Sequence, residues 1–227
     1  MNKTFQLSSA SIFAAAAFCV ALSTASTPTH AQLGSLGSLG GDKKSDSKAE
    51  SKPAAGGDVL AQQDALIKGY VGADKTILKG QAAMAEALGL KERAATLAAT
   101  ADALGNGATK GNLEEADKAL SDANEEMVAK MKSNPELDKR AKAKYAEGLK
   151  LTGKGVQSYL GLKKNFDAFK DALQTASPTV LPKLDGGSYI VRSFPSNSKN
   201  LVQTVSTASE FAKSQRIAVP KEATSVL

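Results

Sequence analysis

The sequence predicts an all-α protein, an up-and-down helical bundle of four or five helices, and three observations support this fold class. Beyond residue 58, apolar residues recur at intervals of three and four, which is the spacing of one face of a helix. Ala, Leu, Lys and Glu, which favour helices, are frequent there. Gly, Asn and Pro interrupt the pattern and indicate short connections between antiparallel neighbours.

Three helices are expected in the first half of this region. The first covers about 58–88, with Asp58 as its N-cap, and the second covers about 90–104, before the Gly105-Asn106-Gly107 stop. The third runs to Met131, with Asn112 as its N-cap and Glu115 as the partner residue of a capping box.

The next helix is predicted to be very long, about 135–176. Its apolar stripe extends from Leu137 to Leu173 in steps of three or four residues, which is typical of a helix packed along one seam. Asn134-Pro135 provides a start signal, because Asn caps a helix and Pro suits the first helical position.

A loop is expected over 178–195. It contains a short extended piece at 188–191, which follows the turn signal Asp185-Gly186-Gly187. A last helix is predicted over about 196–215, and the tail 218–227 is expected to be irregular. Residues 58–217 are therefore predicted to form a single helical-bundle domain.

Residues 1–31 have the pattern of a secretory signal peptide. Lys3 precedes an apolar run from Ile12 to Leu22, and small residues lead to a cleavage site after Ala31. The Gly-, Ser- and Lys-rich stretch 32–57 is predicted to be a disordered, low-complexity linker. We therefore expect a periplasmic or secreted protein, and one that is not transmembrane, because no later apolar stretch approaches 18 residues.

Composition argues against most enzyme chemistry. The chain has one Cys and one His, both within residues 1–31, so the exported protein would lack imidazole and thiol groups. Gly148–Gly155 resembles a phosphate-binding loop but has Gly155 where a hydroxyl is needed, and Ser196 and Lys199 match S-x-x-K without its companion motifs. We expect no catalytic residues, no cofactor and no metal site, and hence not an enzyme.

Charge is unevenly distributed along the chain. Residues 58–127 carry seven basic and twelve acidic residues, whereas residues 128–170 carry eleven and four. Two interpretations follow: the basic helix pairs with its acidic neighbours, or it presents a basic face to an envelope protein, an anionic polymer or a lipid surface. The candidate basic face comprises Lys139, Arg140, Lys142, Lys150 and Lys154. Nucleic acid is not expected as a partner, because no aromatic residues interleave with these lysines.

Two further features concern the interior. Aromatic residues on the long helix either fill the core or line an apolar cavity; they are Tyr145, Tyr159, Phe166 and Phe169. Asp74 and Gln81 lie seven residues apart on or near the first apolar stripe. Such residues usually lie at a solvated edge of the stripe, and the alternative is a buried Asp74 paired with a lysine of the long helix.

Together these features predict an exported, non-enzymatic helical bundle that acts by binding. The first hypothesis is a cell-envelope interaction module with a scaffolding or chaperone-like role. The alternative is a carrier of an apolar small molecule or lipid in a cavity between helices. An enzyme that works without His and Cys is a third, weaker hypothesis, and the sequence does not indicate an oligomeric state.

Overall fold

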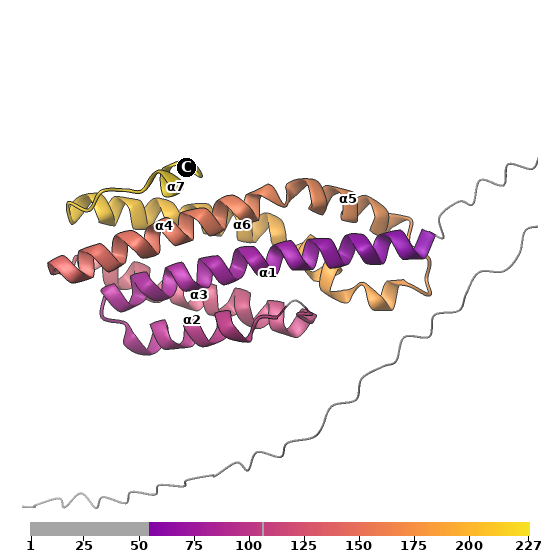
Figure 1. Cartoon of the computed structure of the whole chain (residues 1–227), viewed down its shortest axis with the longest axis horizontal. Coiled ribbons are helices and arrows are strands. Elements are labelled where there is room, and N and C mark those ends of the chain that lie inside the picture. Colours follow the sequence, from indigo (N-terminus) through magenta and orange to yellow (C-terminus); the bar gives the residue numbers. More distant parts are fainter. Residues whose placement is uncertain (1–54, 106) are drawn as a thin grey trace, which may run out of the picture. The chain divides into compact units, whose positions relative to one another are not determined.

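The structure is a computed structural model that describes residues 55–105 and 107–227, with side chains from Asp58 onward. Its helices are α1 (Ala55–Ala87), α2 (Lys91–Ala103), α3 (Lys110–Lys132), α4 (Lys139–Gly161), α5 (Lys163–Gln174), α6 (Asp185–Ser214) and α7 (Lys221–Thr224), with one 3-10 turn at Leu181–Lys183. This described part contains no strands, which confirms the predicted all-α helical bundle (Figure 1). The predicted signal peptide, and the predicted linker up to residue 54, lie outside the described residues.

The long helix is confirmed as one bent helix made of α4 and α5. The two segments meet at Leu162, whose amide donates to the Tyr159 carbonyl at 3.0 Å in a tight turn. The helix begins at Lys139, later than the predicted residue 135. Asp138 is its N-cap, and its side chain accepts a hydrogen bond from the Ala141 amide at 2.7 Å.

Two other helix starts differ from the prediction. α1 begins at Ala55, so Asp58 lies within its first turn and is not the cap. The N-cap of α3 is Thr109, whose hydroxyl accepts from the Asn112 amide at 3.4 Å. The Asn112 side chain in turn accepts from the Thr109 amide at 3.0 Å, so a capping box is present but begins three residues earlier than expected.

The predicted loop over 178–195 is wrong from residue 185 onward, because α6 begins at Asp185. The glycines serve close packing instead of a turn. The Gly187 amide donates to Gln63 Oε1 at 3.0 Å, and a Cβ at Gly187 would lie 2.5 Å from Cζ of the Phe169 ring. Pro195 lies inside α6 at an exposed position and cannot donate a backbone hydrogen bond to the preceding turn. The predicted extended piece at 188–191 is therefore helical, and the tail contains the short helix α7.

The largest contact between helices is that of α1 with α4, and glycines bring the two backbones together. A Cβ at Gly148 would lie 2.6 Å from the Gly80 carbonyl oxygen and 2.8 Å from the Met84 amide nitrogen. A Cβ at Gly80 would lie 2.5 Å from the Thr152 amide nitrogen, and one at Gly155 would lie 2.9 Å from that of Ile77. Backbone atoms cannot move aside as a side chain can, so only glycine fits at these positions.

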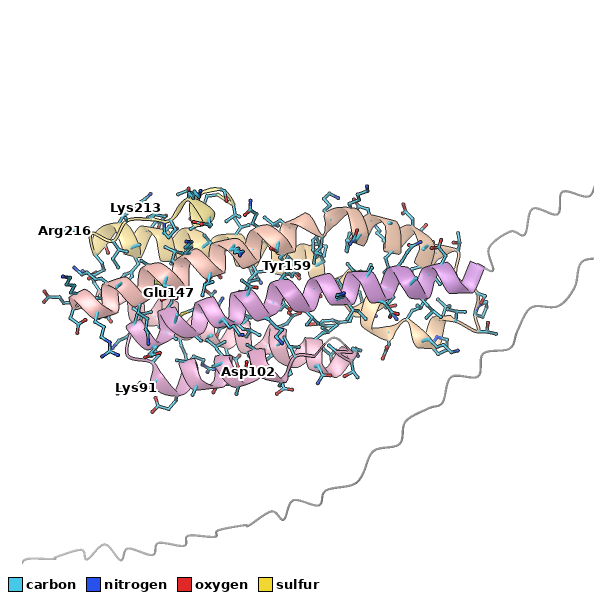
Figure 2. The ribbon with its side chains drawn as sticks, in the orientation of Figure 1. Lys91, Asp102, Glu147, Tyr159, Lys213 and Arg216 are labelled. Carbon is cyan, nitrogen blue, oxygen red and sulfur yellow. The ribbon has the colours of Figure 1, made fainter. Side chains whose placement is uncertain are left out.

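The core is continuous across the helices and contains a row of stacked rings. Phe194 of α6 stacks on Tyr159 and on Phe166, with ring centroids 4.9 and 4.8 Å apart. Figure 2 shows charged residues such as Lys91, Asp102 and Lys213 at the periphery and Tyr159 among the helices. None of the described helices combines the length and apolarity that crossing a membrane requires.

Replacing Gly148 by Ala should destabilise the protein by about 1–3 kcal/mol, because its methyl group would force α1 and α4 apart. Gly72→Ala is the matched control on α1. A Cβ there meets no heavy atom within 4 Å, so this change should raise stability by up to about 1 kcal/mol through helix propensity. Urea denaturation followed by circular dichroism measures both, and equal effects of the two variants would contradict the packing described here.

Candidate functional site

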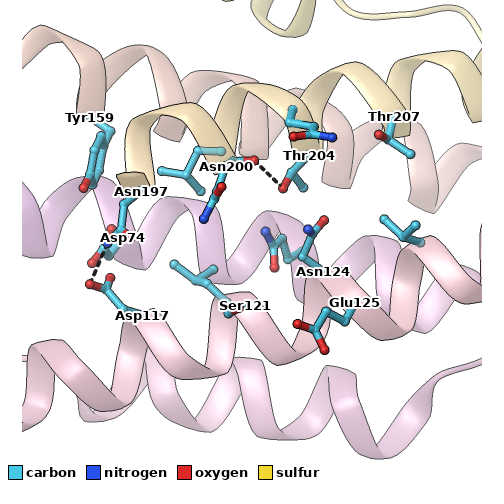
Figure 3. A pocket seen from close by; sticks show the side chains of 15 residues that line it. Asp74, Asp117, Ser121, Asn124, Glu125, Tyr159, Asn197, Asn200, Thr204 and Thr207 are labelled. Carbon is cyan, nitrogen blue, oxygen red and sulfur yellow. Dashed lines mark hydrogen bonds between the residues drawn. The ribbon is translucent and has the colours of Figure 1, made fainter. Parts of the chain in front are cut away.

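A polar pocket of about 370 Å³ lies between α1, α3 and α6, with Tyr159 of α4 at one end (Figure 3). Its volume is within the range of small-molecule sites in proteins. Of the fifteen lining residues, only Leu120, Val128 and Leu201 are aliphatic. The other twelve residues, Tyr159 among them, carry carboxyl, amide or hydroxyl groups, so the pocket differs from the apolar core around it.

Asp117 of α3 is at the centre of a hydrogen-bond cluster at one end of this pocket. Its carboxylate accepts from the Tyr70 hydroxyl at 2.8 Å, from the Tyr189 hydroxyl at 2.6 Å and from the Asn197 amide at 2.7 Å. Burial raises the pKa of Asp117, while these three hydrogen bonds act in the opposite direction. Three donors from α1 and α6 therefore satisfy the oxygens of this carboxylate.

Asp74 of α1 lines the same end of the pocket but has no such partners. Its side chain is 0% exposed, and neither carboxyl oxygen has a hydrogen-bond partner. Burial raises the pKa of Asp74 well above its usual range, and the charge of Asp117 adds to this rise. The expected solvated edge position is therefore wrong, and so is the alternative of a pairing with a lysine of the long helix.

Other buried polar atoms continue this pattern along the pocket. Gln81 is 1% exposed, and its Oε1 has no partner. The Oδ1 of Asn124 and the hydroxyl of Tyr159 are also buried without a partner. Because an unsatisfied buried polar group costs about 1–3 kcal/mol, water or a ligand in the pocket must supply the partners of these atoms.

The structure separates the four aromatic residues that the sequence offered as a cavity lining. All four are buried, but only Tyr159 lines the polar pocket. Tyr145 packs on Phe211 and donates to the Ala208 carbonyl at 3.1 Å. Phe166 stacks on Phe194, and Phe169 packs against Gly187 in the core.

The candidate basic residues all lie on α4. Lys139, Arg140, Lys150 and Lys154 are exposed, and Lys142 is half-buried. Lys150 pairs with Glu222 at 3.8 Å, and the exposed Glu147 shares this helix face. The basic helix α4 packs against the acidic helix α1, and Lys144 forms an ion pair with Glu86 at the edge of this contact.

Sequence reasoning singled out Asp74 and Gln81 but missed Asp117 and Asn197. Asp117 lies beside the apolar stripe of α3, next to Ala116, where a carboxylate normally reaches solvent. The sequence predicts Asn197 at the start of a helix, whereas it lies in the interior of α6. No local signal could have joined these residues, since they are 80 positions apart.

Within the described residues, no group of three or more His, Cys, Asp and Glu side chains could hold a metal ion. Comparison of the chain with models of protein families, with curated proteins and with solved structures finds no match. The function of the site is therefore inferred from its geometry alone.

The raised pKa of Asp74 predicts how the free energy of unfolding depends on pH. The folded protein holds a proton on Asp74 that the unfolded chain releases above about pH 4, so the free energy of unfolding falls as pH rises toward the folded-state pKa. Asp74→Asn removes this contribution. The variant should gain stability relative to wild type by about 1.4 kcal/mol per pH unit over that range.

Urea denaturation of both proteins between about pH 4 and pH 8 measures this difference. Asp102→Asn, which replaces an exposed carboxyl on α2, controls for the loss of one charge. A difference between Asp74→Asn and wild type that does not change with pH would contradict the burial of an unpaired carboxyl.

Proposed function

We propose that this chain is an exported, non-enzymatic binding protein that holds a small polar molecule in the pocket between α1, α3 and α6. Export rests on the signal-peptide pattern of residues 1–31 and would place the protein in the periplasm or outside the cell. Binding rests on the pocket itself, which combines a suitable volume with twelve lining residues that carry polar groups.

The observation that carries this proposal is the fully buried, unpartnered carboxyl of Asp74. Burying such a group without hydrogen bonds is costly, and replacement by an apolar residue of similar size is often stabilising. Residues that break the packing rules in this way are expected at functional sites. A ligand that supplies hydrogen-bond donors to Asp74 would offset the cost.

Binding fits the site better than catalysis does. A general acid–base mechanism needs groups that are free to exchange protons with a substrate. Asp117 is already engaged by Tyr70, Tyr189 and Asn197, which leaves Asp74 as the available carboxyl of this pair. The sequence beyond residue 31 offers no His or Cys to act with it.

The export part of the proposal predicts a mature N-terminus at Gln32. Ala31 ends the best small-x-small pattern after the apolar run, so a signal peptidase should cleave after it. Mass spectrometry of the intact protein from the envelope or medium fraction measures this directly. Retention of Met1 on protein from that fraction would contradict cleavage after Ala31.

The binding part predicts that filling the pocket abolishes ligand uptake without unfolding the protein. Ser121 is an exposed residue of α3 that lines the pocket, so a tyrosine there would occupy the space of a ligand. Saturation-transfer NMR with a polar small-molecule extract of the source cells should show bound ligand signals for wild type. These signals should disappear for Ser121→Tyr.

Ser158→Tyr is the matched control, because Ser158 is exposed on α4 and does not line the pocket. This variant should bind as wild type does. Ligand signals that survive in Ser121→Tyr, or a wild-type protein that takes up nothing from the extract, would refute the proposed binding role.

A further inference from the structure

The unpartnered atoms of the pocket share one chemical property. Asp74 contributes two carboxyl oxygens, which both accept hydrogen bonds once the group is ionised, and Gln81 Oε1 and Asn124 Oδ1 accept as well. The Tyr159 hydroxyl, the remaining buried atom without a partner here, can accept as well. A ligand that satisfies this set must therefore carry several donors.

Charge narrows the ligand class further. Three acidic residues line the pocket, namely Asp74, Asp117 and Glu125, and no Lys or Arg is among its lining residues. This acidic lining occurs in a chain with a formal net charge of +6. Ligands with ammonium groups combine many donors with the opposite charge, and charge-assisted hydrogen bonds are about twice as strong as neutral ones.

The acidic groups lie at the two ends of an elongated site. Asp74 and Asp117 lie together at the buried end, whereas Glu125 is exposed and eight residues further along α3 (Figure 3). Eight residues of helix span about 12 Å. Asn124 directly precedes Glu125 on α3, and Leu120 and Leu201 add apolar surface to the lining of the pocket. This arrangement suits a linear aliphatic chain with nitrogens at its ends and not a compact cation.

We propose that the pocket binds a linear aliphatic polyamine, with one terminal ammonium on Asp74 and the other toward Glu125. An inner nitrogen would donate to Gln81 and Asn124, and the methylene groups would contact Leu120 and Leu201. This inference rests on the proposed binding function and names the ligand class of the same pocket.

Proton exchange accompanies binding in this arrangement. The groups that face the buried end are Tyr70 on α1, Asp117 on α3, Tyr159 on α4 and Tyr189 on α6. None of them is a cation, so the empty pocket favours a neutral Asp74 carboxyl. When an ammonium group binds, the Asp74 proton leaves to solvent and the ligand keeps its own protons. The affinity for the ligand should therefore rise with pH up to the pKa of Asp74 in the empty pocket.

Isothermal titration calorimetry of the full chain with spermidine and with 1,5-diaminopentane tests the proposal. Asp74→Asn should weaken spermidine binding by at least about 30-fold, because it removes the buried partner of the charge. Glu125→Gln should weaken it by about twofold to fivefold, since Glu125 is exposed. Glu115→Gln, at an exposed position of α3 outside the pocket, is the matched control and should bind as wild type does.

Titrations in two buffers of different ionisation enthalpy count the released protons. Wild type should release up to one proton per spermidine, and Asp74→Asn should release none. The pocket-filling variant Ser121→Tyr gives an independent check, because it should abolish binding while Asp74 stays in place. Equal spermidine affinities of wild type, Asp74→Asn and Ser121→Tyr would overturn the proposal.

Two matched probes distinguish a failure of the polyamine assignment from a failure of the proposed binding function. 1,5-Pentanediol has the same chain as the diamine but no charge, and glutarate has the opposite charge. If either perturbs the NMR signals of Ser121 and Thr204 while the amines do not, the pocket binds small molecules but the polyamine assignment is wrong. If the amines, the diol, glutarate and the cell extract all give no bound ligand, the proposed function itself fails.

Discussion

The close approach of α1 to α4 is the constraint on which the rest of the structure depends. At Gly80 and Gly148 the two backbones lie so close that a methyl group on either glycine would clash with the other helix. Gly155 makes the same kind of contact with the backbone at Ile77. Such packing fixes both the separation of the helices and the rotation of α1 about its axis, since no other face of α1 offers a glycine seam to α4. The other helices then pack on a pair whose geometry is already set.

That rotation explains why Asp74 and Gln81 point into the pocket. Successive residues of a helix are separated by about 100° around its axis, so positions 74 and 81 share a face about 100–120° away from Gly80. With Gly80 turned to α4, this face is directed toward α3 and α6. The close contact of α1 with α4 thus keeps the unpartnered Asp74 carboxyl in the interior. Without it, α1 could turn about its axis and bring this carboxyl to solvent. Stability and the proposed function therefore depend on the same contact.

The sequence predicted what repeats along the chain and missed what depends on contacts between distant residues. Helical spacing identified the bundle and the long helix, because the apolar residues that form one buried face recur every three or four positions, but it did not predict the bend at Leu162. The prediction failed at 185–195, where Gly186, Gly187 and Pro195 are residues typical of a loop. Gly187 in fact packs against Gln63 and Phe169 inside the bundle. Sequence reasoning noted Asp74 as unusual but could not find Asp117 or Asn197, whose roles arise only where α3 and α6 meet α1.

The protonation state of Asp74 in the ligand-free protein tests the central claim most directly. A pH titration of the side-chain carboxyl carbons by ¹³C NMR, with Asp74→Asn to assign the signal, measures it without unfolding or ligand. Because burial without a partner favours the neutral form, the Asp74 signal should remain that of a carboxylic acid while exposed carboxyls ionise. An Asp74 that ionises together with the exposed carboxyls would show that the pocket does not hold a buried, unpartnered acid.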